Sequence, residues 1–191
     1  MIEIEAKMKI DDPAPLAALL QSRHARCLGD FLETNTFFDT QNRDLLAADR
    51  GVRLRVSRNV ATGQATCVLT HKGPNRRGPF KSREETELGV ADARQAQRLL
   101  ECLGYVRTLS FQKRRQSWTL DDCRVELDEV PYVGRFVEIE GPSESAVMRM
   151  RSELGLADRP LIKASYIAMV SAYLQERGDR RTQIVFGQTS A

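Results

Sequence analysis

Residues 1–10 read MIEIEAKMKI, and apolar and charged side chains alternate through almost all of this stretch. Successive side chains of a β-strand point to opposite faces, whereas a helix brings together residues three or four apart. The stretch therefore predicts a strand with an apolar face, made of Ile2, Ile4, Ala6 and Met8, and a charged face, made of Glu3, Glu5 and Lys7. The charged face must either meet water or lie against groups that neutralise it.

The same alternation returns along the chain and predicts seven more strands, over about residues 30–39, 51–58, 64–72, 81–88, 108–119, 122–130 and 134–141. Helical spacing of apolar residues predicts helices over about 13–23, 92–103, 143–154 and 163–176. Strands in mostly sequential hairpin order form a meander that can close into a barrel. The predicted fold is α+β, an eight-stranded antiparallel β-barrel with helices packed outside.

The length of 191 residues suits one domain, which we place at residues 1–176. We expect a frayed C-terminal tail over 177–191, although Ile184, Val185 and Phe186 could add a short strand. No apolar run approaches the roughly 18 residues of a membrane helix, and the charged N-terminus does not resemble a secretory signal. These features predict a cytoplasmic protein with no membrane partner. The four cysteines are scattered without metal-site spacing, which predicts free thiols.

Acidic and basic side chains are sorted by strand. The acids gather on the first, seventh and eighth predicted strands, and the bases on the third, fourth and sixth. A sheet with one solvated face also alternates in this way, but such faces usually mix uncharged polar residues with the charges. If the charged faces point inward instead, the interior of the barrel contains Lys7, Arg53, Arg55, Lys72, Arg83, Lys113 and Arg115 together with Glu3, Glu5, Glu85, Glu87, Asp128, Glu138 and Glu140.

Burying so many charges is unfavourable unless they are paired or neutralised by bound ions. Divalent cations near the acidic strands and a polyanion near the basic strands would neutralise both sets. Carboxylate oxygens suit Mg²⁺ or Mn²⁺, and guanidinium and ammonium groups suit phosphate oxygens. The charge pattern therefore favours a site for a metal ion and a polyphosphate.

Several short motifs follow one another in the chain: Glu3-Ile4-Glu5-Ala6-Lys7, Phe38-Asp39-Thr40, Arg53-Leu54-Arg55, Lys72-Gly73-Pro74, Arg83-Glu84-Glu85-Thr86-Glu87, Lys113-Arg114-Arg115, Leu127-Asp128-Glu129-Val130, Phe136-Val137-Glu138-Ile139-Glu140 and Ser165-Tyr166. In this order they resemble the CYTH superfamily, the triphosphate tunnel metalloenzymes. The branch of class IV adenylyl cyclases and thiamine triphosphatases is the most similar. The similarity spans about residues 1–175, and the ordered combination is far more specific than any one motif.

This resemblance implies a role for each matching charged residue. The metal ligands, for Mg²⁺ or Mn²⁺, would be Glu3, Glu5, Asp128, Glu138 and Glu140. The triphosphate would bind to Lys7, Arg53, Arg55, Lys72, Arg83, Lys113 and Arg115, of which Arg83 could instead only pair with its acidic neighbours. Catalytic roles would fall to Lys7, Arg55 and Glu85.

Two reactions suit such a site. Water attacking the terminal phosphorus hydrolyses a triphosphate, such as inorganic tripolyphosphate, thiamine triphosphate or a nucleoside triphosphate. A ribose 3′-hydroxyl attacking the α-phosphorus of ATP yields 3′,5′-cyclic AMP and pyrophosphate. Hydrolysis is preferred because it needs only the charged residues, whereas cyclisation also needs a purine site, for which Arg76, Arg77 and Phe80 are the only candidates.

A non-catalytic polyphosphate or nucleotide sensor is a further alternative, although it would not need the metal-binding acids. Only 6% of residues are aromatic and the bases share strands with acids, which argues against a nucleic-acid partner. The predicted partner is a small-molecule triphosphate. A homodimer is compatible with the sequence, which does not fix the oligomeric state.

Overall fold

The structure is a computed structural model that describes residues 2–76, 78 and 80–188, apart from the side chains of Ile2 and Glu3. Its strands are β1 (Ile2–Ile10), β2 (Arg26–Asp39), β3 (Gly51–Asn59), β4 (Ala65–Lys72), β5 (Lys81–Gly89), β6 (Val106–Leu120), β7 (Cys123–Val130), β8 (Gly134–Glu140) and β9 (Gln183–Ile184). Its helices are α1 (Ala14–Ser22), α2 (Asp44–Ala47), α3 (Ala93–Cys102), α4 (Glu144–Glu153) and α5 (Tyr166–Glu176).

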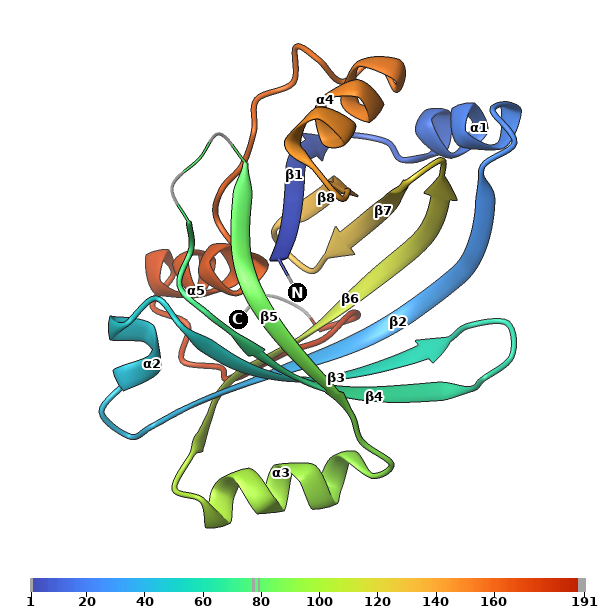
Figure 1. Cartoon of the computed structure of the whole chain (residues 1–191). Helices are drawn as coiled ribbons and strands as arrows, with labels where there is room; N and C mark the ends of the chain where they lie inside the picture. The colour runs from blue at the N-terminus through green and yellow to red at the C-terminus, as the bar shows by residue number, and fades with distance from the viewer. Residues whose placement is uncertain (1, 77, 79, 189–191) are drawn as a thin grey trace.

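Eight strands close into an antiparallel barrel, as predicted (Figure 1). Their order is β2-β3-β4-β5-β1-β8-β7-β6, and β6 returns to β2 through a long register that runs from Arg26↔Thr119 to Asp39↔Val106. The strands that were predicted to carry the acids, β1, β8 and β7, are neighbours in this order, so their side chains form one continuous acidic wall.

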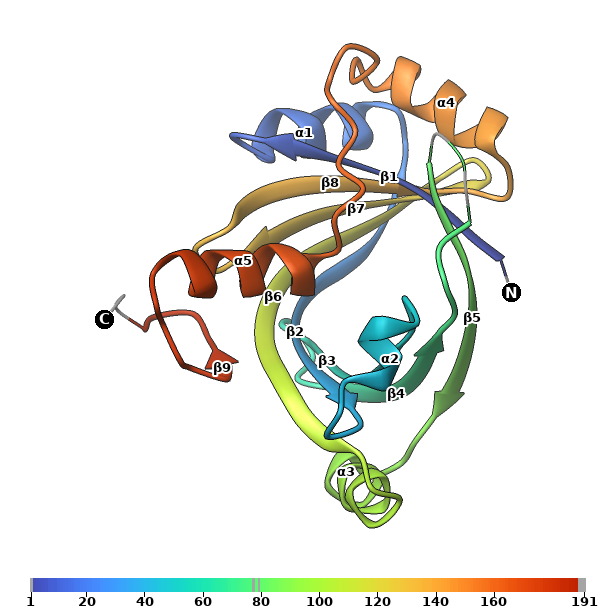
Figure 2. The same ribbon diagram turned by 90° about the vertical axis from the view of Figure 1, so that its left-hand side faces the viewer.

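The register places the charged side chains of neighbouring strands on the same face. Lys7 lies opposite Glu138, and Arg115 lies opposite Asp128. On the other face, apolar residues such as Met8 are fully buried against α1 and α4, whose Leu20 and Met150 belong to the same core. Both views show α1 and α4 at one end of the molecule and α3 at the other (Figures 1 and 2). The apolar faces therefore point outward to the helices, as the sequence predicts.

One end of the inner face is apolar and is covered by α5. Phe136 lies opposite Asp128 and so shares its face, where it packs with Phe111 against Tyr166 and Val170 of α5. The rings of Phe136 and Tyr166 meet edge to face at 5.3 Å between centroids. Helix α5 thus closes this end of the barrel and brings Tyr166 to the edge of the charged interior.

Helix α2 is the one helix of the described chain that the sequence does not predict. It has four residues, too few for any apolar period to appear. The buried carboxylate of Asp39, at the end of β2, accepts hydrogen bonds from the backbone N–H groups of Leu45 (2.9 Å) and Leu46 (3.1 Å). Two hydrogen bonds to the end of β2, rather than helical propensity, hold this turn in place. All the described helices are too short or too polar to traverse a lipid bilayer.

The short strand that Ile184, Val185 and Phe186 could add to the C-terminal tail is present, so the tail is not frayed at this point. Gln183 and Ile184 form β9, which pairs in parallel with β6 at Ser110 and Phe111, and the side chain of Ile184 is fully buried. The ring of Phe186 lies 4.1 Å from the guanidinium carbon of Arg114. The apolar residues Ile184–Phe186 are typical of a strand, but whether this segment pairs depends on a free edge of β6.

Replacing Ile184 with alanine should lower the free energy of unfolding by about 2 kcal/mol, because it empties a buried site that a short segment can only partly refill. Urea titration followed by circular dichroism measures the change. Gln183→Ala, at the exposed neighbouring position, should change stability by less than about 0.5 kcal/mol. Equal, small effects of the two substitutions would show that the tail is not docked in solution.

Candidate active site in the barrel

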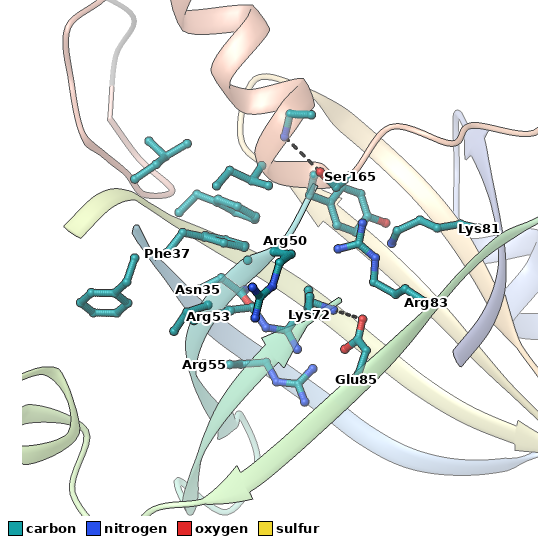
Figure 3. A pocket seen from close by; sticks show the side chains of 18 of the residues that line it. Asn35, Phe37, Arg50, Arg53, Arg55, Lys72, Lys81, Arg83, Glu85 and Ser165 are labelled. Atoms are coloured by element: carbon teal, nitrogen blue, oxygen red, sulfur yellow. Dashed lines mark hydrogen bonds and ion pairs between the residues drawn. The ribbon is translucent and has the colours of Figure 1, made fainter. Parts of the chain in front are cut away.

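A cavity of about 970 Å³ occupies the inside of the barrel. Most of the predicted site residues line it. They are Glu5, Lys7, Arg53, Arg55, Lys72, Arg83, Glu85, Lys113, Arg115, Glu138 and Glu140. Asp128 is buried beside the cavity, behind Lys113 and Arg115. The side chain of Glu3 lies outside the described part of the chain. Figure 3 shows the basic side chains Arg53, Arg55, Lys72, Lys81 and Arg83 converging on this space.

Arg115 is the centre of the acidic wall. Its Nε and Nη2 atoms donate to the two carboxylate oxygens of Asp128 at 2.7 and 2.6 Å, and Nη2 also donates to Glu138 at 2.6 Å. Burial would lower the pKa of Arg115, but Asp128, Glu33 and Glu126 raise it well above its usual range. This guanidinium is therefore a permanent cation that holds several carboxylates together.

Lys7 completes the pairing of Glu138. Its ammonium nitrogen lies 3.3 Å from a Glu138 oxygen, donates to the carbonyl of Ala164 at 2.9 Å and lies 4.1 Å from the centre of the Tyr166 ring. Burial would raise the pKa of Glu138, but Lys7, Arg115 and further basic groups lower it well below its usual range. Glu138 is consequently an ionised carboxylate at neutral pH.

The opposite wall carries the basic residues of β3, β4 and β5. Arg53 and Arg55 lie 3.6 and 3.7 Å from Glu87, and Arg53 donates to the hydroxyl of Thr70 at 3.3 Å. Lys72 pairs with Glu85, its register partner on β5. Arg83 donates to the side chain of Asn75 at 3.1 Å and lies 3.6 Å from Asp49, so it reaches beyond the acids of its own strand.

Glu33 is a buried acid of the site that the sequence analysis did not identify. It lies on β2 at 3.3 Å from Lys113 and 3.9 Å from Arg55, and thus links the basic residues of β6 and β3. Burial would raise the pKa of Glu33, but Lys113, Arg115 and the arginines of β3 lower it well below its usual range. Glu33 and Asn35 are two residues apart and therefore lie on the same face of β2, which could have indicated that Glu33 points inward.

The unusual pKa of Glu33 predicts a specific response to acid. A carboxylate whose pKa is lower in the folded state than in the unfolded state stabilises the fold above its ordinary pKa of 4.5, and this contribution is lost as the pH falls below that value. Glu33→Gln should therefore flatten the acid side of the stability profile, measured by urea unfolding at a series of pH values. Glu101→Gln on the exposed face of α3 is the matched control. A profile for Glu33→Gln that parallels the wild type would contradict the assignment.

Three further residues belong to the site, although the sequence did not assign a role to any of them. Lys81 lies 2.5 Å from Glu5, its register partner across β1 and β5. The buried hydroxyl of Tyr166 donates to Asp128 at 2.9 Å. Glu126 lies opposite Glu138, and one of its oxygens is buried without a hydrogen-bond partner. Burial raises the pKa of Glu126, and the charge of Asp128 adds to this effect. The contacts of Lys81 and Tyr166 join elements that are distant in sequence, whereas Glu126 and Glu138 face each other across the β7–β8 hairpin.

Among the described residues of the loop between β4 and β5, neither Arg76 nor Phe80 lines the cavity. Phe80 is buried in the core with Met150 and residues of β1, and Arg76 is exposed. Arg77 lies outside the described residues. Phe80 therefore stabilises the contact between this loop and α4 instead of presenting its ring to a ligand.

The acidic wall fits a hard divalent cation in its donor chemistry. Glu5 and Glu140 are register partners, as are Glu126 and Glu138, and like charges placed directly opposite each other are destabilising unless a cation lies between them. In the described part of the chain no three such groups already surround a metal position. Lysine and arginine side chains neutralise these acids instead. The carboxylate oxygens are nonetheless the type of ligand that Mg²⁺ or Mn²⁺ prefers.

Comparison with known families agrees with this geometry. The family model described as the CYTH domain matches residues 1–153. The chain belongs to the CYTH family. Members of this family are adenylyl cyclases or triphosphatases that bind triphosphate substrates and depend on divalent metal ions. The resemblance inferred from the motifs is therefore confirmed.

Three known proteins are similar to this CYTH protein in sequence or in fold. A protein of Methanocaldococcus jannaschii named as a candidate adenylate cyclase is 24% identical over 88% of this chain and 98% of its own length. PH1819 from Pyrococcus horikoshii has the same fold, with a TM-score of 0.78, 23% identity and coverage of 90% and 99% of the two chains. HpAC1 from Hippeastrum, described as having a dominant triphosphatase activity, has a TM-score of 0.67, 21% identity and coverage of 90% and 95%.

Proposed function

We propose that this CYTH protein hydrolyses a triphosphate in a reaction that depends on Mg²⁺ or Mn²⁺. The observation that supports it best is that a single cavity joins a basic wall on β3, β4 and β5 to an acidic wall on β1, β7 and β8. The basic wall suits phosphate oxygens, and the acidic wall would hold a divalent metal ion. A site for phosphate alone would not need the acidic wall, and a site for a metal ion alone would not need the basic wall.

The proposed roles follow from these positions. Glu3, Glu5, Asp128, Glu138 and Glu140 would hold the metal ion. Both oxygens of Asp128 already accept hydrogen bonds from basic groups, so this residue would also orient Lys113 and Arg115. The triphosphate would bind to Lys7, Arg53, Arg55, Lys72, Arg83, Lys113 and Arg115, which all line the cavity.

Phosphoryl transfer needs positioning and charge neutralisation more than covalent chemistry. The metal ion, when bound, supplies Lewis acidity toward phosphate oxygens and lowers the pKa of coordinated water. Arg55 and Lys7 would donate hydrogen bonds to the oxygens on which negative charge increases as the bond to the leaving group breaks. Glu85 would fix the direction of the Lys72 ammonium group, with which it is paired. These groups are preorganised by strands, so little rearrangement opposes the reaction.

Cyclisation of ATP is the second candidate, and the name of the M. jannaschii relative favours it. It uses the same charged walls but needs the ribose 3′-hydroxyl in line with the α-phosphorus. A sensor without catalysis is less well supported, because Glu5, Glu138 and Glu140 all remain in the cavity.

Product analysis distinguishes these functions. The protein is incubated with ATP, thiamine triphosphate or tripolyphosphate, with Mg²⁺ or Mn²⁺, and the products are resolved by anion-exchange chromatography. We expect release of orthophosphate that stops when the metal is chelated. Cyclic AMP and pyrophosphate as the main products would overturn hydrolysis in favour of cyclisation, and binding without any product would support the sensor.

A further inference from the structure

Arg83 is a buried cation of the cavity whose partners lie outside its own strand. The two acids that follow it on the same face of β5 are already occupied, because Glu85 pairs with Lys72 and Glu87 lies near the two arginines of β3. Among the described residues, Arg83 has instead one hydrogen bond and one ion pair, both with residues of surface loops. Figure 3 shows Arg83 and Lys81 pointing into the same part of the cavity.

Asn75, in the loop between β4 and β5, lies across from Arg83. Backbone N–H groups of this loop, at Gly73 and Arg76, donate to carbonyls of β5 on either side of Arg83, at 2.9 and 2.7 Å. The side-chain oxygen of Asn75 accepts a hydrogen bond from Nε of Arg83 at 3.1 Å. The guanidinium group is planar and rigid, so a bond to Nε fixes the direction of its two terminal nitrogen atoms.

Asp49 holds Asn75 in its turn. It lies between α2 and β3 with a left-handed backbone, at φ 52°, which aspartate tolerates better than most residues. Its carboxylate accepts hydrogen bonds from the backbone nitrogen of Asn75 at 2.7 Å and from the side-chain nitrogen at 3.0 Å. The amide oxygen of Asn75 is therefore left to face Arg83.

Asp49 is also the one described carboxylate that forms an ion pair with Arg83, at 3.6 Å from a terminal nitrogen. The side chain of Asp49 is 55% exposed, whereas that of Arg83 is 10% exposed. An exposed carboxylate at this distance neutralises a buried guanidinium group only weakly, because water screens the attraction. The buried cation therefore still favours an anion inside the cavity.

We propose that Asn75 is a positioning residue that aims Arg83 at a phosphate group of the substrate, and that Asp49 is a temporary counterion which this phosphate replaces. Phosphate oxygens accept hydrogen bonds from both terminal nitrogen atoms of an arginine, whereas Asp49 approaches only one of them. Asn75 keeps its bond to Nε while the counterion changes. This inference rests on the proposed function, because it concerns how the same triphosphate is bound.

Calorimetric titration with tripolyphosphate in EDTA measures this binding without cleavage. Asn75→Ala should weaken binding roughly fivefold, as expected when one orienting hydrogen bond is lost. Asn59→Ala is the matched control, because Asn59 also fixes a hairpin loop, by accepting hydrogen bonds from Ala61 and Thr62, but does not line the cavity. The control should bind tripolyphosphate as the wild type does. Unchanged affinity of the Asn75→Ala protein would overturn the positioning role.

A double substitution tests whether Asn75 acts through Arg83. Arg83→Met should weaken tripolyphosphate binding by about tenfold or more, because it removes a charged donor. In the Arg83→Met protein, Asn75→Ala should have no further effect on affinity. An additive loss would contradict the proposal, because it would show that Asn75 supports the loop and does not aim Arg83. Urea unfolding shows whether each variant is folded.

Asp49→Asn should change the affinity in the opposite direction. It removes the negative charge near Arg83 but keeps an oxygen that can accept from Asn75, so tripolyphosphate should bind about threefold more tightly. Asp30→Asn is the matched control, because Asp30 accepts a hydrogen bond from Gln116 and does not line the cavity. Equal effects of the two substitutions would reflect net charge alone and would reject Asp49 as the counterion.

Failure of this inference can be told apart from failure of the proposed function. Tripolyphosphate binding that responds to Asn75 and Asp49 as expected, with no cleavage when Mg²⁺ or Mn²⁺ is added, would retain the inference and reject hydrolysis. Metal-dependent cleavage by a protein whose affinity is insensitive to both residues would reject the inference alone. A wild-type protein that does not bind tripolyphosphate would also overturn the inference.

Discussion

Glu138→Gln is expected to lower the rate of triphosphate cleavage by more than about a hundredfold, because it removes a carboxylate from the acidic wall at the point where Lys7 and Arg115 converge. The amide keeps the shape of the side chain but has no negative charge to offer a cation. Initial rates over a range of Mn²⁺ concentrations measure both the rate and the apparent affinity for the metal. Loss of rate together with a weaker metal response is the expected pattern.

Glu129→Gln is the matched control for this experiment. Glu129 lies on β7 beside Asp128 but on the outer face, where it pairs with Arg114 at 3.1 Å. The same chemical change should leave the rate within about a factor of two, since exposed ion pairs contribute little. An active Glu138→Gln protein with the metal dependence of the wild type would exclude Glu138 as a ligand. Urea unfolding of both variants shows whether any loss reflects the fold.

Arg115→Met should lower the free energy of unfolding by about 3–5 kcal/mol in the absence of metal. Removing one partner of a buried ion pair leaves its counterions uncompensated, and Arg115 is the partner of both Asp128 and Glu138. Methionine fills much of the volume, so the change reports mainly on charge. Addition of Mn²⁺ should restore part of the stability, because the cation can replace the lost positive charge.

Arg114→Met provides the comparison for Arg115→Met at the adjacent position of β6. Arg114 points to the outer face and its side chain is 61% exposed, so its removal should cost less than about 1 kcal/mol. The contrast between neighbouring arginines tests the direction in which the strand faces. Similar destabilisation in both variants, measured by urea titration, would contradict the burial of Arg115 in the charged interior.

The strands, and the face on which each strand carries its charges, could be predicted because the alternation of apolar and charged residues is visible within each segment. β1 shows this well, since Lys7 is buried inside the barrel and Met8 is buried under the helices. Helix α2 and strand β9 could not be predicted in the same way. Hydrogen bonds that Leu45 and Leu46 donate to the carboxylate of Asp39 hold α2, and β9 depends on an edge of β6 that becomes available only after the barrel closes.

The site could be predicted in its composition but not in its pairing. The motifs indicate which charged residues belong to the interior, and all those with described side chains lie in or beside the cavity. They do not indicate that Lys81 pairs with Glu5 or that Glu33 pairs with Lys113. Those contacts depend on strand register across the barrel, which no single segment encodes.

The amino-acid sequence by itself determined that the chain forms a charged antiparallel barrel of the CYTH kind, because side-chain alternation and motif order are written along the chain. Only the tertiary structure decided that β1, β8 and β7 form one acidic wall, and that Phe37, Leu46 and Ile167 line the same cavity. The physical reason is that these groups come from segments far apart in sequence. Their proximity arises from closure of the barrel and the docking of α2 and α5, and from no local preference.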